Sequence, residues 1–169
     1  MDQRSDGPRR AGVQTLAVHA GEAPDPGTHA SAPNLVMSTT FVIDPDVAFS
    51  ANEITQDTPF AYSRWGNPTV SQLERKLAAL EGTEACIAFA SGMAAIWALF
   101  SRLLTSGDHI VMSDVTYAAA SELANDTLPD LGIEVTRTDT SDLDGLRKAL
   151  RPNTRLLYLE TPANPLLRL

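Results

Sequence analysis

The stretch "ACIAFASGMAAIWALF", residues 85–100, contains the change of pattern that decides the fold. Residues 85–90 form an apolar run of the length expected for a buried strand. Ser91 and Gly92 end that run, and from Met93 onward the apolar residues recur at helical spacing. Because a buried strand that leads directly into an amphipathic helix is the repeating unit of α/β proteins, this stretch predicts a sheet with covering helices.

The same alternation continues on both sides of this stretch. The predicted strands are apolar nearly throughout, which is typical of a mainly parallel sheet covered by helices on both faces. Ligands bind at the carboxyl ends of the strands in such sheets, so the loops at 91–93, 113–119 and 160–165 are the candidate site. The other predicted strands are 109–113, 133–138 and 155–160, and the other predicted helices are 69–82, 117–130 and 142–150.

Residues 62–69, "YSRWGNPT", place a phenol, a guanidinium and an indole beside a turn that precedes a helix. Asn67 or Thr69 can cap that helix, Pro68 suits its first turn and Gly82 suits its end. One interpretation is a surface turn with a half-buried aromatic residue. The other is an anion site, for which a phosphate is the natural ligand.

The bulk composition excludes several classes of function. The chain has 169 residues, 43% of them hydrophobic, and a net charge of -8, which argues for a globular domain and against nucleic acid as the main partner. The acidic stretch 120–145 is interpreted as a solvated face, because no His or Cys joins its carboxylates at ligand spacing, and no metal site is predicted. Cys86 is the only cysteine and is expected to be buried and inert. No apolar run is long enough to span a membrane.

The three candidate loops each allow a second interpretation. Gly92 follows a strand and opens a helix, where free N–H groups favour an anion, although Ser91-Gly92 can equally be a simple cap. Tyr117 comes just after a strand end, so its ring either faces the cleft or packs on the surface as an ordinary helix-start aromatic residue. In "ETPANP" the two prolines hold a loop that presents Glu160 and Asn164, or they make a rigid connector.

Taken in order, these motifs resemble the Cys/Met-metabolism enzymes that use pyridoxal 5′-phosphate (PLP), such as cystathionine gamma-synthase, cystathionine gamma-lyase and methionine gamma-lyase. The resemblance covers nearly the whole chain. It implies a PLP-dependent transferase-like fold of type I, with an extended N-terminal arm at 1–61 that contacts a neighbouring subunit. It also implies that residues 62–169 are the first part of the PLP-binding α/β domain. The motifs are "VHAGE" (18–22), "STTF" (38–41), "YSRWGNPT" (62–69), "ASGMAAI" (90–96), "GDHIV" (107–111) and "ETPANP" (160–165).

The resemblance assigns the phosphate of the cofactor to two groups of residues. Tyr62 and Arg64 are implied to bind the phosphate in a neighbouring subunit, and the planar fork of a guanidinium suits that task. Gly92 and Met93 are implied to supply backbone N–H groups to the same phosphate. An isolated monomer would then lack a complete site.

The resemblance assigns the cofactor ring to the other two loops. Tyr117 is implied to stack on the pyridine ring and to act as a catalytic residue in proton transfer. Asn164 is implied to contact the 3-hydroxyl side of the ring, and Glu160 to support that loop. The residues after Tyr117 are alanines at 118–120, where many family members carry glycines or a cysteine, and this difference bears on substrate specificity.

The chain has only two lysines, Lys76 and Lys148, and neither matches the Schiff-base lysine of the family. The expectation is therefore that this chain is the N-terminal portion of a longer enzyme. The alternatives are one subunit of a split enzyme and a non-catalytic binding or assembly module.

The resemblance also implies an activity and a setting. The expected activity is gamma-elimination or gamma-replacement on a sulfur amino acid or an acylated homoserine, in transsulfuration and in methionine and cysteine metabolism. The expected setting is a cytoplasmic homo-oligomer, a dimer of dimers, without nucleic-acid or membrane partners.

Overall fold

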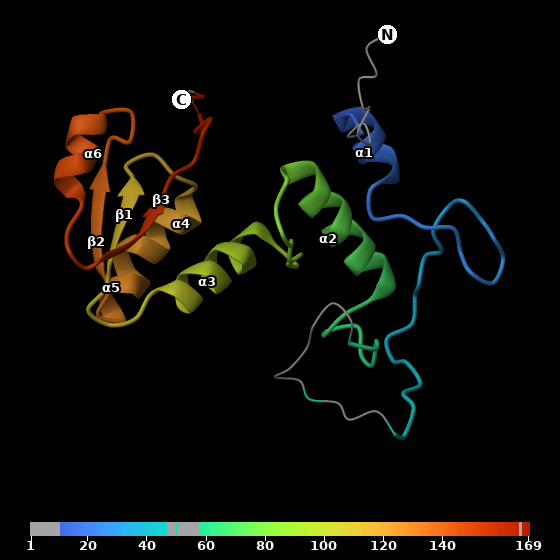
Figure 1. Cartoon of the computed structure of the whole chain (residues 1–169). Coiled ribbons are helices and arrows are strands. Elements are labelled where there is room, and N and C mark those ends of the chain that lie inside the picture. The colour runs from blue at the N-terminus through green and yellow to red at the C-terminus, as the bar shows by residue number, and fades with distance from the viewer. Residues whose placement is uncertain (1–10, 47–49, 51–57, 166) are drawn as a thin grey trace, which may run out of the picture. The chain divides into compact units, whose positions relative to one another are not determined.

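A computed structural model of the chain describes residues 11–46, 50, 58–165 and 167–169 (Figure 1). Within it the chain forms two compact units, Met1–Ala88 and Phe89–Leu169. Three parts of the predicted N-terminal arm, at 1–10, 47–49 and 51–57, lie outside the described residues. The boundary between residues 61 and 62 and the contact of the arm with a neighbouring subunit both stay predictions.

The second unit contains a three-stranded parallel sheet in the order β2-β1-β3. In the register, Ile110 in the middle strand β1 lies opposite Val135 of β2 and Leu156 of β3. The chain thus runs from β1 to one edge of the sheet and then crosses to the other edge. This confirms the predicted parallel sheet and three of its strands. The bounds are His109–Ser113 for β1, Glu134–Thr138 for β2 and Thr154–Tyr158 for β3.

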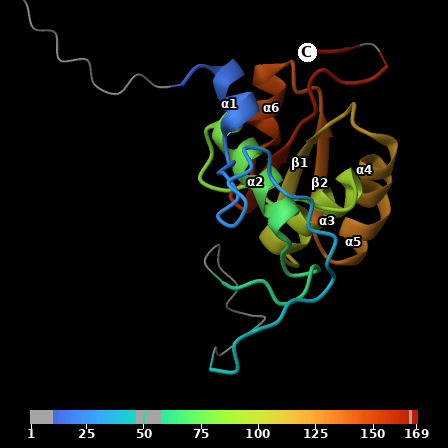
Figure 2. The same ribbon diagram turned by 90° about the vertical axis from the view of Figure 1, so that its right-hand side faces the viewer.

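Helices cover this sheet on both faces, as the apolar strands predict (Figure 1 and Figure 2). Helix α6 lies on one face, and the helical segment α4–η1–α5 lies on the other, as right-handed crossovers on either side of β1 require. The segment is one continuous helix with a π turn in its middle, next to Pro129, which lacks the N–H that a regular α-helix needs. The bounds are Gly92–Leu103 for α3, Ala118–Glu122 for α4, Leu123–Thr127 for η1, Leu128–Asp130 for α5 and Leu143–Ala149 for α6.

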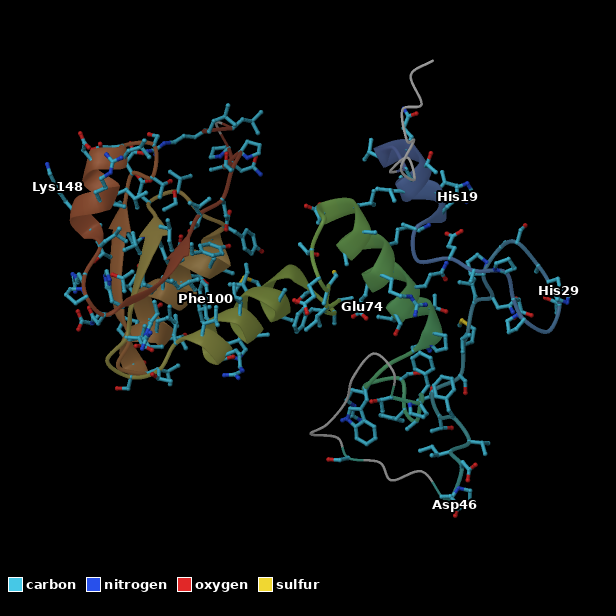
Figure 3. The ribbon with its side chains drawn as sticks, in the orientation of Figure 1. His19, His29, Asp46, Glu74, Phe100 and Lys148 are labelled. Atoms are coloured by element: carbon cyan, nitrogen blue, oxygen red, sulfur yellow. The ribbon has the colours of Figure 1, made fainter. Side chains whose placement is uncertain are left out.

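The hydrophobic core lies between α3, the α4–η1–α5 segment and one face of the sheet. Phe100 of α3 is fully buried and meets the ring of Tyr158 edge-on, with 5.3 Å between the ring centroids (Figure 3). This contact packs the helix that begins at Ser91 against the strand that leads to Glu160. The buried members of the core are Phe100, Leu104, Ile110, Met112, Ala124, Leu128 and Ile133.

A buried histidine joins the three strands on the opposite face of the sheet. His109 of β1 is fully buried, and its Nδ1 and Nε2 lie 2.7 Å and 2.9 Å from the hydroxyls of Thr154 and Thr136. Burial lowers the pKa of His109, and the nearby Arg151 guanidinium lowers it further. The neutral ring can donate one hydrogen bond and accept the other, so each flanking strand is tied to the middle one.

The predicted strand at 85–90 is wrong for the structure described here. Residues 85–89 form neither a helix nor a strand, and Ile87 and Phe89 are 72% and 45% exposed. Cys86 is half-buried rather than buried. The backbone N–H of Ala88 instead donates to the Glu74 carboxylate, at 2.8 Å. An apolar run favours a strand only where a sheet edge meets it, and a sequence pattern does not locate that edge.

The first unit is built on helix α2, Pro68–Glu81. Asn67 caps it by accepting the N–H of Thr69, and Gly82 ends it in the left-handed conformation, which confirms the predicted caps. Helix α1, Val13–His19, was not predicted from the sequence, because its N-cap Gly12 offers no side-chain acceptor and none of its residues is buried. In the described parts of the chain, no helix is long and apolar enough to cross a membrane.

The loop after α1 packs tightly on α2. Gly21 has a φ of 73°, and a Cβ there would lie 2.9 Å from the backbone nitrogen of Lys76. The Lys76 ammonium donates to the carbonyl of Val18 at 2.9 Å and forms an ion pair with Glu22. The glycine and the glutamate of the "VHAGE" motif therefore dock the N-terminal helix on α2.

Candidate functional site

The carboxyl end of β3 is joined to the start of α4 by one carboxylate. Glu160 accepts the backbone N–H of Tyr117 at one oxygen, at 2.9 Å, and the hydroxyl of Tyr158 at the other, at 2.6 Å. Tyr158 is half-buried against Phe100, so the hydroxyl reaches Glu160 from the edge of the core. Two of the residues predicted for the site, Tyr117 and Glu160, are thus brought together, and Tyr158 is a third member that the sequence analysis missed.

The Tyr117 ring is presented to solvent by this contact. Tyr117 is the N-cap of α4, its own side chain makes no capping hydrogen bond, and the residue is 59% exposed. Glu160 holds its backbone while the ring stays available to stack on a flat ligand. Burial raises the pKa of Tyr158 well above its usual value, and the hydrogen bond to Glu160 adds to the effect, so Tyr158 remains a donor at neutral pH.

The loop at residues 91–93 forms the start of α3. Ser91 accepts the N–H of Ala94 at 3.1 Å and so caps the helix, which is compatible with both interpretations of this loop, a simple cap and an anion site. The N–H groups of Gly92 and Met93 lie in the first turn, where helix geometry provides no intrahelical acceptor. A Cβ added at Gly92 would meet nothing within 4 Å, so packing among the described residues does not explain the glycine. Gly92 is exposed, and the first turn of a helix favours an anion, but the role of these N–H groups in binding phosphate stays a prediction.

The loop that carries Asn164 is fastened to the ends of β1 and β2. Ala163 and Arg168 exchange two backbone hydrogen bonds, of 2.8 Å and 3.1 Å, across the loop. The Arg168 guanidinium then binds Asp114, which follows β1, and Asp139, which follows β2. Hydrogen bonds from Ser141, together with Arg168, lower the pKa of Asp139 to about 2, so it stays ionised at neutral pH. Asn164 itself is exposed.

A small cleft lies at this edge of the sheet. Its volume is about 190 Å³, and polar groups from all three strand ends reach it. The sequence analysis did not identify Arg168, because a single arginine in a polar loop gives no pattern. The lining residues are Ser113, Thr140, Ser141, Leu159, Glu160, Thr161, Ala163, Arg168 and Leu169.

The Tyr62–Arg64 pair lies in the first unit. The Arg64 guanidinium donates to the Tyr62 hydroxyl at 3.2 Å and lies 5.1 Å from the centre of the Tyr62 ring. Trp65 packs edge-on against the same ring, at 5.8 Å between centroids. A phenol that accepts from a guanidinium keeps its own proton to donate, so the pair presents convergent donors to an anion. Arg64 is exposed, and no carboxylate in the described ranges forms an ion pair with it.

The structure therefore joins the predicted residues in two pairs. Tyr62 meets Arg64 in the first unit, and Tyr117 meets Glu160 in the second. Within the described residues of the second unit, no hydrogen bond joins Asn164 or the N–H groups of residues 92 and 93 to Tyr117 or Glu160. The predicted roles of all these residues toward a cofactor stay predictions.

Neither lysine lies at the candidate site. Lys76 is inside α2 and is held by Glu22, and Lys148 is exposed in the last turn of α6, at the surface of the second unit (Figure 3). Neither lysine follows the end of a strand. Among the described residues, no group of His, Cys, Asp and Glu side chains could hold a metal ion.

Comparisons with known proteins agree with the geometry. Residues 14–169 match the family described as Cys/Met metabolism PLP-dependent enzyme. The chain is 43% identical to the canavanine gamma-lyase of Pseudomonas canavaninivorans over 89% of this chain and 38% of that protein. It is 40% identical to the O-succinylhomoserine sulfhydrylase of Pseudomonas aeruginosa over 94% of this chain and 39% of that protein.

Solved structures give the same result. The crystal structure of cystathionine gamma-lyase from Lactobacillus plantarum, complexed with L-serine, matches with a TM-score of 0.79 and 36% identity. The match covers 93% of this chain and 39% of that structure. The chain thus spans about two fifths of the length of the relatives that it matches.

Proposed function

Because the chain belongs to the family of Cys/Met metabolism PLP-dependent enzymes, we propose that it forms the N-terminal portion of an enzyme of gamma-elimination or gamma-replacement. The observation that carries this proposal is the Tyr117–Glu160–Tyr158 contact. It supports an exposed aromatic ring at the carboxyl edge of a parallel sheet, which is where α/β proteins bind their ligands.

The donors in both units fit a phosphorylated, flat cofactor. The first turn of α3 offers the N–H groups of Gly92 and Met93, and the Tyr62–Arg64 pair offers a guanidinium and a phenol. We assign these four residues to the phosphate of PLP, with Tyr62 and Arg64 supplied by a neighbouring subunit. When bound, PLP withdraws electrons from the carbon atoms of the substrate.

The protein's own groups then orient the ring and manage protons. Tyr117 stacks on the ring, and its hydroxyl transfers a proton during the reaction. Glu160 fixes the position of Tyr117 through the backbone, so the ring keeps its place while the hydroxyl stays unbound by Glu160. Asn164 faces the 3-hydroxyl side of the ring from a loop that Arg168 fastens to two strand ends.

The substrate is an amino acid with a leaving group on its gamma carbon. Sulfur amino acids and acylated homoserines both meet this description, and the names of the similar proteins include both a lyase and a sulfhydrylase. The alanines at 118–120 lie directly after Tyr117, at the start of α4, and we propose that they influence which substrate is accepted. The enzyme works in the cytoplasm as a dimer of dimers, in which residues 1–61 contact a neighbouring subunit.

A second candidate function is a non-catalytic binding or assembly module, or one subunit of a split enzyme. The observation that favours it is that both lysines lie within helices, Lys76 in α2 and Lys148 in α6, and that neither follows a strand. The two candidates differ in where a cofactor becomes attached.

The test uses the full-length protein as it is produced. The preparation is incubated with PLP, reduced with borohydride and measured by intact mass, and turnover of cystathionine, methionine, canavanine and O-succinylhomoserine is assayed in parallel. An adduct on a chain that contains residues 1–169, with turnover of one substrate, is the expected result. An adduct on a separate chain supports a split enzyme. No adduct and no turnover contradict the catalytic proposal.

A further inference from the structure

We infer that Asn67 is a positioning residue, which holds the Tyr62–Arg64 pair in the geometry that binds a phosphate. The inference rests on the proposed function of that pair. Asn67 is the residue that joins the turn at 62–66 to helix α2, and the proposal concerns its side chain rather than its place in the chain.

Asn67 is a buried polar residue in a largely exposed unit. Only 8% of its surface is exposed. Its Nδ2 group lies within hydrogen-bond distance of the carbonyl of Val36 at 3.1 Å, the carbonyl of Ser38 at 3.4 Å and the hydroxyl of Ser63 at 3.1 Å. Its Oδ1 accepts the N–H of Thr69 at 2.9 Å. One side chain therefore joins a segment about thirty residues away to the turn and to the first turn of α2.

The same segment fixes Tyr62 from both sides. Tyr62 and Thr40 form an antiparallel bridge, in which the N–H of Phe41 donates to Ala61 and the N–H of Ser63 donates to Thr39. The hydroxyl of Ser63 adds a hydrogen bond to the carbonyl of Ser38, at 2.6 Å. Because Asn67 binds this hydroxyl and the Val36 carbonyl, it closes the frame in which Tyr62 is held.

The presence of asparagine at position 67, rather than another N-cap residue, distinguishes the positioning role from helix capping. Serine and aspartate are as good as asparagine at an N-cap, so capping alone does not require an amide. Two N–H donors that point away from the helix are specific to asparagine among these residues. An aspartate at position 67 would place a charged acceptor against the carbonyls of Val36 and Ser38, without a donor between them.

The Tyr62–Arg64 pair is expected to bind an anion more tightly when its geometry is fixed before binding than when the pair is mobile. If Tyr62 and Arg64 must be ordered when the ligand arrives, the entropy cost of ordering them lowers the affinity. Asn67 removes part of this cost before binding, since the frame sets the backbone on both sides of Tyr62. Its effect therefore has to appear on ligands that carry a phosphate and not on ligands that lack one.

The experiment compares PLP with pyridoxal, which is the same molecule without the phosphate. Both dissociation constants are measured on the full-length protein freed of cofactor, by absorbance and fluorescence titration. Asn67→Ser keeps the helix cap and removes the outward donors. It is expected to weaken PLP about tenfold, as for the loss of one hydrogen-bonded contact, and to change pyridoxal less than twofold. Asn125→Ser, at an exposed position in η1, is the matched control and changes neither.

Two further variants keep the inference testable. Ser63→Ala removes one hydrogen-bond partner of Asn67. It is expected to lower the affinity for PLP relative to pyridoxal by less than Asn67→Ser does. Arg64→Ala tests the proposed function itself, because it must lower the affinity for PLP relative to pyridoxal. In the double variant with Asn67→Ser, the affinity for PLP relative to pyridoxal is expected to fall by less than the product of the two single effects, because both residues act on the same phosphate-binding pair and only Tyr62 of that pair remains.

The outcomes are distinct. Equal weakening of PLP and pyridoxal in folded Asn67→Ser, or no weakening of PLP, overturns the role of Asn67. An unchanged ratio in Arg64→Ala overturns the phosphate role of the pair and the inference with it. A changed ratio in Arg64→Ala with an unchanged ratio in both Asn67→Ser and Ser63→Ala leaves the proposed function standing and removes only the inference.

Discussion

Replacing Tyr158 with phenylalanine tests whether Glu160 holds the start of α4 in place. The ring of residue 158 keeps its contact with Phe100 in this variant, so only the hydroxyl is lost. Glu160 then retains the N–H of Tyr117 and loses its other donor. The expected result is a less stable second unit in which the start of α4 opens more often.

The magnitude follows from the contact. A hydrogen bond to a charged group contributes roughly 1.5–3 kcal/mol, and Glu160 and Tyr158 are only half-buried, so about 1–2 kcal/mol of unfolding free energy is expected to be lost. Burial and, to a smaller extent, the same hydrogen bond raise the pKa of Tyr158, and the effect on stability has a defined sign. Because the folded state holds the proton more tightly than the unfolded chain, the contribution is fully present below the usual pKa of 10.0 and is lost as the pH rises above it.

The assay is urea unfolding of the full-length protein, together with hydrogen–deuterium exchange of peptides that cover residues 114–122. Tyr158→Phe should speed exchange at the Tyr117 amide modestly, and Glu160→Ala, which removes both contacts, should speed it more. The wild-type stability should also fall between pH 9 and pH 11 more steeply than that of Tyr158→Phe. Stability within about 0.3 kcal/mol of wild type, with unchanged exchange, would refute the reasoning, since the expected loss is several times larger.

Three other predictions follow from separate contacts. Arg64→Lys should recover part of the PLP affinity that Arg64→Ala loses, about 1.5–3 kcal/mol, because an ammonium keeps the charge without the planar fork, and titration of cofactor-free protein measures this. Because the pKa of His109 is lowered in the folded state, its contribution to stability is present above the usual pKa of 6.5 and is lost as the pH falls below it. The unfolding free energy should therefore fall less steeply between pH 7 and pH 4.5 in His109→Asn than in the wild type, which unfolding curves at each pH measure. Lys76→Met should free α1 from α2 and speed exchange across residues 13–22, whereas Lys148→Met, at an exposed site, should leave that exchange unchanged.

Much of the second unit follows from local sequence. The strand at 109–113 has the predicted bounds, and the helix at 92–103 begins where the sequence predicts it. The caps of α2 were also predictable, because Asn67, Pro68 and Gly82 act within one turn of the helix. Each of these features depends on neighbours in the sequence, which a pattern records.

The parts that could not be predicted depend on distant partners. The run at 85–90 has the composition of a strand, but in the structure no described strand accepts it. Helix α1 is weak alone and gains its place from Lys76, more than fifty residues away. Among the site residues, Tyr117 and Glu160 were identified by resemblance, whereas Arg168 acts through Asp114 and Asp139, which no single motif contains together with it. Tyr158 lies only two residues before Glu160, but no motif in the sequence marks its hydroxyl as a partner of that carboxylate.

The contact between Glu160 and residue 117 is made by a main-chain atom. This hydrogen bond therefore does not depend on which side chain residue 117 carries, whether that side chain changes in evolution or by mutagenesis. A lineage or a protein engineer can exchange the aromatic group there, and with it the face offered to a ligand, while the attachment of α4 to the end of β3 is inherited unchanged. The side chain at position 117 can therefore be exchanged while the backbone contact that positions it stays the same.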